Sequence, residues 1–212
     1  MSVDRSGRAW VLYSSGEIFW VSTVDATCQR SSFTKGQAGF ELFGMGFVSD
    51  SPGSAKETLF VAGASASQQN TGTSRLGKID PATLQLSSLG SLATAMYSPE
   101  LTGTGDAELY GYYPGSANTF VAKINKENGQ SAQTWGLPPL DNDVRAWAFA
   151  HWGGQFYIFV TTIDLFDPFS MATNSQVWLL NPKTSSATKI LDNLPYIIVG
   201  AGVSTCAPVL IP

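Results

Sequence analysis

Two small residues flanking a third form a pattern that recurs four times, at intervals of about 50 residues. The copies are Gly44-Met45-Gly46, Gly103-Thr104-Gly105, Ala148-Phe149-Ala150 and Gly200-Ala201-Gly202. Glycine weakens a strand interior, because it loses more entropy on ordering and offers no side chain to pack. A pattern that keeps its place in four units therefore indicates positions where backbones must approach closely.

Each of the first three copies precedes a run of aromatic and β-branched residues, namely ETLFVAG, AELYGYY and GQFYIFV. The N-terminal run RAWVLYS has no such copy before it, and the copy at Gly200 has no run after it. Farther along each unit stands a turn residue, Asp80, Asn125 or Asn181, with a weaker copy at Asp25. Asp and Asn suit turns, because their side chains bond to the backbone ahead. The chain thus divides into four similar units, one of them split across the two ends.

Such runs, bounded by Gly, Pro and Ser, are typical of strands, and no segment shows a sustained helical period. A circular all-β repeat predicts a four-bladed β-propeller of antiparallel strands, formed by residues 1–212 as a single domain. The expected strands, from the axis outwards in each blade, are 197–205, 9–14, 17–22 and 29–33; 42–49, 58–63, 75–79 and 85–89; 101–106, 108–113, 120–124 and 131–135; 145–151, 155–160, 176–180 and 187–191.

The C-terminal strand is expected to join the N-terminal blade as its innermost strand. This closure would remove a free sheet edge. The small residues would then let four inner strands crowd one axis. The alternative is five blades, which would promote Met1–Asp4 to an inner strand. That segment lacks the small-residue pattern, so four blades are preferred.

Charged residues make up only 13% of the chain, with a net charge of −4 and a pI near 4.9. No basic stripe is available for phosphates, so nucleic acid is not an expected partner. Apolar runs are too short to span a bilayer. A surface of Ser, Thr, Gly, Asn and Gln is common in exported all-β proteins. We therefore expect a monomer in an extracellular, periplasmic or cell-surface location, although no signal segment is present in the sequence.

Two cysteines, Cys28 and Cys206, lie near opposite ends of the chain. Two readings are open. They are buried free thiols, or they form a disulfide that ties the ends together in an oxidising compartment. The expected closure of the ring slightly favours the disulfide.

The architecture resembles small propellers, including the four-bladed hemopexin type. The stretches WVLYSSGEIFWVSTVDATC, ELFGMGFVSD, PELTGTGDAELYG and VGAGVSTCAPV also resemble an uncharacterised group of secreted or lipid-anchored bacterial propeller proteins. This resemblance covers most of the chain. It implies the fold and an exported location, but no activity.

The face that carries the starts of the inner strands also carries the longest loops, 64–74 and 161–175, and is the expected binding face. Glu41, Glu100 and Arg145 each stand three residues before a small-residue pair and would ring the channel mouth. They form either a structural ion pair or a polar pocket. Phe166 and Phe169 make the second loop unusually apolar. That loop either folds onto the channel or forms a contact patch.

The sequence supplies no motif for catalysis. His151 has no evident nucleophile or metal-ligand cluster beside it, and a structural or solvent-facing role is expected. The acidic pairs Asp141/Asp143 and Asp164/Asp167 do not fit a dedicated calcium loop. No metal or cofactor is expected, although inner-strand carbonyls could hold an ion or waters in the channel.

The preferred function is a non-catalytic binding or scaffold module that recognises a protein, peptide or glycan. The alternative is a propeller-type lyase or hydrolase with Glu41 and Glu100 as its acid–base pair.

Overall fold

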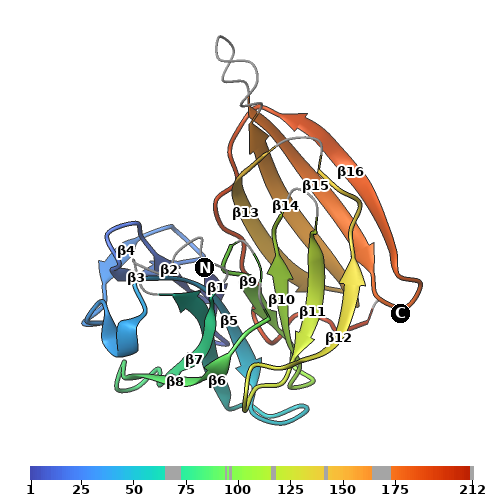
Figure 1. The fold of residues 1–212 in the computed structure, drawn as a ribbon. Coiled ribbons are helices and arrows are strands. Elements are labelled where there is room, and N and C mark those ends of the chain that lie inside the picture. Colours follow the sequence, from blue (N-terminus) through green and yellow to red (C-terminus); the bar gives the residue numbers. More distant parts are fainter. Residues whose placement is uncertain are drawn as a thin grey trace.

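Four antiparallel sheets of four strands each make up the computed structural model (Figure 1), which describes residues 1–64, 73–93, 95, 97–115, 118–140, 143–163 and 173–210. The sheets are arranged as a four-bladed β-propeller, which confirms the predicted fold class. Within each sheet the strands follow chain order from the axis outwards. The blades comprise β1 (Ser2–Val3), β2 (Arg8–Leu12), β3 (Ile18–Ser22) and β4 (Cys28–Arg30); β5 (Leu42–Ser49), β6 (Glu57–Ala64), β7 (Arg75–Ile79) and β8 (Leu86–Ser91); β9 (Glu100–Gly103), β10 (Leu109–Tyr113), β11 (Phe120–Ile124) and β12 (Ser131–Gly136); and β13 (Asp143–Trp152), β14 (Gln155–Ile163), β15 (Thr173–Asn181) and β16 (Ser186–Leu194). A 3-10 turn, η1 (Gln37–Gly39), precedes β5.

The repeated Asp and Asn residues form the turns between the third and fourth strands. The side chains of Asp80, Asn125 and Asn181 each accept a hydrogen bond from the backbone N–H two residues ahead, at 2.8, 2.8 and 2.9 Å. In the first blade the equivalent position is Ser22, whose Oγ accepts from the Val24 N–H at 3.2 Å. The Ser22 carbonyl also accepts from the Ala26 N–H, as the Asp80 carbonyl accepts from the Leu84 N–H. Asp25 lies later in the same turn and accepts from the Thr27 N–H at 3.1 Å, so it belongs to the turn without being the equivalent of Asp80.

The small-residue repeat marks close contact between inner strands, as predicted. A Cβ atom added to Gly44 would lie 2.4 Å from the carbonyl oxygen of Pro99. One added to Gly103 would lie 2.1 Å from the carbonyl oxygen of Phe47. Both distances are shorter than any that real Cβ atoms show. Backbone atoms of β5 and β9 therefore occupy the space that larger side chains would need.

The ring closes differently from the prediction. Residues 195–210 form no strand, and the innermost strand of the first blade is β1, in which Ser2 pairs with Trp10 and Val3 with Ala9. The five-blade alternative had identified this segment as an inner strand, but it belongs to the first of four blades. Gly202 still approaches it closely, because an added Cβ would lie 3.0 Å from the Met1 carbonyl oxygen. The C-terminal segment thus packs beside β1 without joining the sheet.

That segment contacts several blades through polar groups. Thr205 is buried, and its hydroxyl accepts from the Arg5 guanidinium at 2.9 Å and donates to the Glu57 carboxylate at 2.7 Å. Farther along, the Pro208 carbonyl accepts from the Gly153 N–H at 2.7 Å. Arg5, Glu57 and Gly153 come from the first, second and fourth blades. The C-terminal segment therefore connects blades that lie far apart in the sequence.

Three buried apolar clusters lie between consecutive blades. Trp10, Met45 and Phe47 belong to the first cluster, between blades one and two. Val48, Leu76 and Leu109 belong to the second, between blades two and three. Tyr112, Phe149 and Phe156 belong to the third, between blades three and four. Side chains at alternate positions of each strand fill these layers, which explains the strand pattern of the sequence.

The two cysteines are free and exposed, so the predicted disulfide is absent and the alternative of buried thiols is also wrong. Cys28 begins β4, the outermost strand of its blade. Three strand spacings, about 14 Å, separate β4 from β1. Cys206 lies near the inner edge of the same blade, because its N–H bonds to the Ser204 hydroxyl, which in turn bonds to the carbonyl of Asp4, the residue directly after β1. A disulfide requires Cα atoms within about 7 Å, so the two cysteines are too far apart to form one.

Native labelling tests this arrangement. The folded protein is expected to take up two carbamidomethyl groups from iodoacetamide without prior reduction, because both thiols are exposed. Intact mass spectrometry measures the uptake, and a Cys28→Ser variant, which should take up one group, provides the control. Uptake only after treatment with a reductant would contradict the structure.

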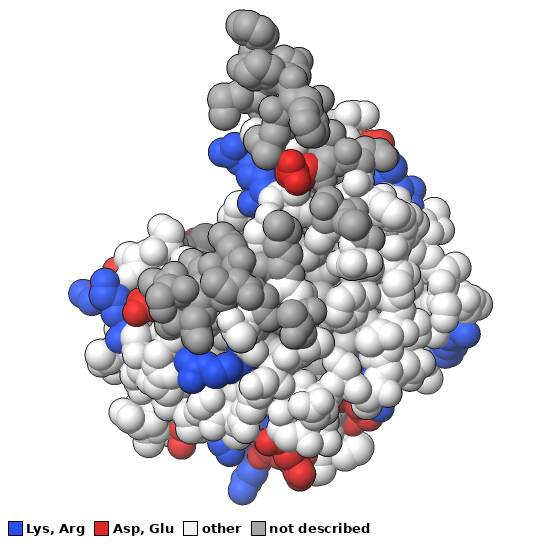
Figure 2. Space-filling view, in the orientation of Figure 1, with Lys and Arg blue, Asp and Glu red and all other residues white. Residues whose placement is uncertain are grey.

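Charged side chains are sparse on the surface. In the face shown in Figure 2, Lys and Arg lie in small separate groups and form no continuous patch among the described atoms. Within the described residues no helix is long and apolar enough to cross a membrane.

Candidate ligand-binding pocket near the propeller axis

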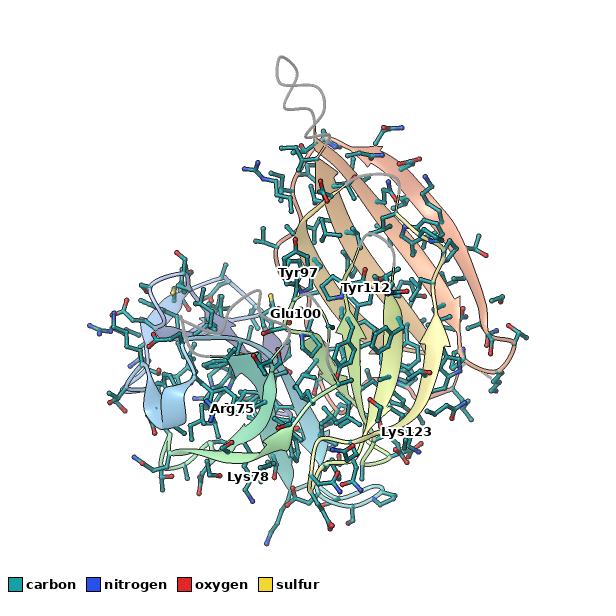
Figure 3. The ribbon with its side chains drawn as sticks, viewed as in Figure 1. Arg75, Lys78, Tyr97, Glu100, Tyr112 and Lys123 are labelled. Atoms are coloured by element: carbon teal, nitrogen blue, oxygen red, sulfur yellow. The ribbon has the colours of Figure 1, made fainter. Side chains whose placement is uncertain are left out.

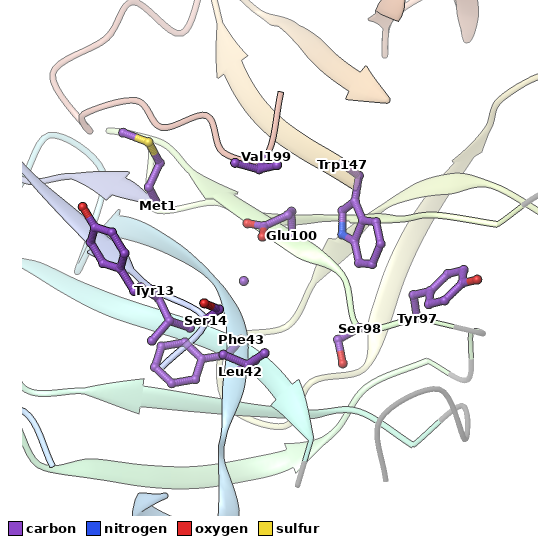
Figure 4. Close-up of a pocket in the computed structure, with 12 residues that line it drawn as sticks. Met1, Tyr13, Ser14, Leu42, Phe43, Tyr97, Ser98, Glu100, Trp147 and Val199 are labelled. Atoms are coloured by element: carbon purple, nitrogen blue, oxygen red, sulfur yellow. The ribbon is translucent and has the colours of Figure 1, made fainter. Parts of the chain in front are cut away.

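A cavity of about 300 Å³ opens beside the β2–β3 turn and the starts of β5 and β9 (Figure 4). It therefore lies on the face that the topology predicted for binding. Its size is at the lower end of the range for small-molecule sites. The residues that line it are Met1, Leu12, Tyr13, Ser14, Leu42, Phe43, Gly44, Tyr97, Ser98, Glu100, Trp147 and Val199.

Glu100 occupies the inner side of this pocket, at the first residue of β9. It lies beside Gly44 of β5, where an added Cβ would come within 3.1 Å of Oε2 of Glu100. The glycine repeat thus has a second consequence, because the missing side chain leaves room for this carboxyl group. Figure 3 places Glu100 and Tyr97 at the junction between the first two blades and the last two.

The carboxyl group of Glu100 is in an environment that disfavours its charge. Desolvation by burial raises its pKa above the ordinary value, opposed by attraction to the Met1 amino group and by a hydrogen bond from the Met45 N–H. No Lys, Arg or His is among the described residues that line the pocket. Strongly perturbed carboxyl groups in a cleft are characteristic of functional sites.

Aromatic side chains form two walls of the pocket. On one side the rings of Tyr97 and Trp147 pack together, with centroids 5.2 Å apart. On the other side stands Tyr13, held by an edge-on contact with Phe19 at 4.9 Å and 46% exposed. Phe43 also lines the pocket. The pocket therefore combines aromatic surfaces with one buried carboxyl group.

Of the predicted ring of charges, only Glu100 lines this pocket. Gly44 stands level with Glu100, so Glu41 lies three residues, about 10 Å, farther along the axis. Its carboxylate lies beside Gly36, where an added Cβ would be 3.6 Å from Oε1 of Glu41. Arg145 is exposed, at the irregularity between Val144 and Ala146. Phe166 and Phe169 lie outside the described residues, so their predicted role stays a prediction.

The sequence reasoning missed Tyr13, Tyr97 and Trp147. The prediction placed the binding residues three residues before each small-residue pair, as if these positions lay at the same height along the propeller axis in every blade. The inner strands are in fact offset, so residues at different distances from the pairs converge on the pocket. Trp147 directly precedes Ala148, and this proximity to the repeat was the one sequence signal that could have identified it.

His151 has the structural role that was expected. It is 7% exposed, and its ring stacks on Tyr110 and meets Phe156 edge-on. Its backbone N–H donates to the Thr102 hydroxyl. Desolvation lowers its pKa to about 4, opposed by the charge of Asp106, so the ring is neutral at pH 7. A neutral histidine packed among aromatic rings contributes to the core rather than to the pocket.

Within the described part of the chain, no cluster of three His, Cys, Asp or Glu side chains could hold a metal ion. Asp141, Asp164 and Asp167 fall outside that part. The ion or waters considered for the channel stay a prediction.

No protein-family model and no curated protein matches the chain. Solved structures of similar fold include an engineered GH43 glycoside hydrolase with endo-xylanase and exo-arabinofuranosidase activity, at 12% identity and a TM-score of 0.59 over 92% of this chain and 41% of that one. The GH43 β-1,3-galactosidase BT0265 matches at 10% identity and a TM-score of 0.53, over 89% and 47%. Kuenenia stuttgartiensis hydrazine synthase matches at 15% identity and a TM-score of 0.50, over 89% and 52%.

These similarities establish the fold alone. The chain spans about half the length of those three proteins, or less. The identities are low, and the neighbours include both glycoside hydrolases and a hydrazine synthase. The fold defines a small β-propeller, and its function has to be argued from the pocket.

Proposed function

We propose that this protein is a non-catalytic, exported module that binds a glycan in the axial pocket. The observation that carries the proposal is the combination of aromatic walls, formed by Tyr13, Tyr97 and Trp147, with the carboxyl group of Glu100. The apolar faces of sugar rings pack well on aromatic side chains, and sugar hydroxyls bond to buried polar groups. The low charge and polar surface support the exported location.

A propeller hydrolase is the second candidate, favoured by the GH43 glycoside hydrolases among the structures of similar fold. Glycoside hydrolysis ordinarily requires two carboxyl groups about 5 to 9.5 Å apart across the scissile bond. Among the described lining residues Glu100 is the one carboxylic acid, and Glu41 does not line the pocket. Binding without hydrolysis is therefore the preferred function.

A glycan array followed by calorimetry on the best oligosaccharide tests this proposal. Tyr13→Ala is expected to weaken binding about tenfold or more, because an aromatic contact of this kind contributes on the order of 1 to 2 kcal/mol. Tyr13 is 46% exposed, so the fold should tolerate the change. Tyr196→Ala is the matched control, since Tyr196 is 64% exposed and lies outside the pocket.

Three results would contradict the proposal. They are binding to no glycan, equal weakening by the Tyr13 and Tyr196 substitutions, and steady release of reducing sugar from the bound oligosaccharide. The last result would establish the hydrolase instead.

A further inference from the structure

We propose that the glycan recognised by this pocket carries a protonated amine, as an amino sugar without an N-acetyl group does. The inference rests on the proposed function and specifies the ligand that the same pocket binds. It is drawn from the charge of one residue, from the kind of side chains around it and from the open wall of the pocket.

The negative charge of Glu100 has little compensation in the pocket. A carboxylate removed from water is costly unless a positive group or several hydrogen bonds compensate it. The recorded compensation is a hydrogen bond from the Met45 N–H and the attraction of the Met1 amino group. Met1 itself lines the pocket, and the described lining residues add no cationic side chain to its amino group. An ammonium group on the ligand would add a second positive charge and three hydrogen-bond donors beside Glu100.

The aromatic walls of the pocket favour a positively charged ligand as well. The faces of tryptophan and tyrosine rings attract cations, and the attraction is stronger where water is excluded. Tyr97 and Trp147 stand on one side of the carboxyl group and Tyr13 on the other (Figure 4). An ammonium group close to Glu100 would lie between these rings. An acetamido group would lose both the charge pair and the attraction to the rings.

The pocket also has room for a ligand beside Glu100. Glu100 lines the pocket and is only partly buried, so it keeps contact with the pocket space. Tyr13 is half-exposed at the opposite wall, so the pocket is open to solvent there. The carboxyl group can therefore be reached by the substituent of a sugar ring, while the ring itself rests on the aromatic side chains.

Calorimetry with two matched probes tests the inference. The probes are a glucosamine oligosaccharide and its fully N-acetylated counterpart, both at one pH at which the amines of the first probe are protonated. The glucosamine form is expected to bind about tenfold tighter or more, as is typical when a charged hydrogen bond is formed. Glu100→Gln is expected to abolish this ratio, because it removes the negative charge that would pair with the amine. The substitution keeps the size of the side chain and an oxygen that can accept from the Met45 N–H.

The outcomes separate the two proposals. If the N-acetylated probe, or a neutral glycan from the array, binds as tightly as the amine or tighter, the inference is wrong while glycan binding stands. If no sugar binds, the proposed function fails and this inference fails with it. A ratio that survives Glu100→Gln, in a variant whose thermal unfolding is unchanged, would overturn the role of Glu100. The Tyr196→Ala variant should keep the wild-type ratio.

Discussion

Gly103→Ala is expected to lower the free energy of unfolding by about 3 kcal/mol or more, or to prevent folding. The new methyl group would lie 2.1 Å from the Phe47 carbonyl oxygen and 2.5 Å from Cγ2 of Val48. The first of these is a backbone atom of β5, so relief requires the second and third blades to move apart. Such a movement would open the cluster that contains Val48 and Leu109.

Urea denaturation followed by tryptophan fluorescence measures the effect. Gly136→Ala is the matched control, because an alanine at this strand end would meet nothing within 4 Å. It should change stability by less than about 1 kcal/mol, in the stabilising direction. If Gly103→Ala and Gly136→Ala had equal stabilities, the steric explanation of the small-residue repeat would be wrong.

Asp4→Ala is expected to cost about 3 to 5 kcal/mol, because the Asp4 carboxylate organises the start of the first blade. Its Oδ1 accepts from the N–H groups of Ser6 and Arg8, each at 3.0 Å. Its Oδ2 accepts from Trp10 Nε1 at 2.9 Å and from Arg8 Nε at 3.1 Å. Trp10 is fully buried, so its N–H would be left without a partner.

The same residue predicts how stability depends on pH. Desolvation raises the pKa of Asp4, but hydrogen bonds from Ser6, Trp10 and Arg8 outweigh it and leave the pKa below the ordinary value. A lowered pKa contributes stability above the pKa of the unfolded chain, near 3.9, and that stability is lost as pH falls through the folded-state pKa. Wild type should therefore lose more stability than Asp4→Asn on acidification.

Thermal unfolding at a series of pH values between 7 and 2 checks both statements. Asp25→Ala is the control, because Asp25 is exposed and bonds only within its own turn. It should cost less than about 1 kcal/mol. An Asp4→Ala variant as stable as Asp25→Ala would show that the buried carboxylate is not required.

Much of the architecture could be predicted because it depends on local chemistry. The runs around Phe60, Tyr112 and Phe156 are strands in any context that buries one face. Asp80, Asn125 and Asn181 form turns through bonds to residues two positions ahead, which need no distant partner. Because these signals recur in register with the small-residue pairs, they were sufficient to count four blades.

The closure and the pocket depend on how distant segments meet. Strand β1 occupies the place beside β2 that was predicted for the segment around Gly202, because Ser2 pairs with Trp10, and that segment packs against β1 instead. Likewise Glu100, rather than Glu41, reaches the pocket because the inner strands are offset along the axis. The amino-acid sequence specified the strands, the turns and the number of blades, since these follow from contacts close in the chain. The offset between blades and the path of the C-terminal segment follow from packing around the axis, which no local pattern encodes.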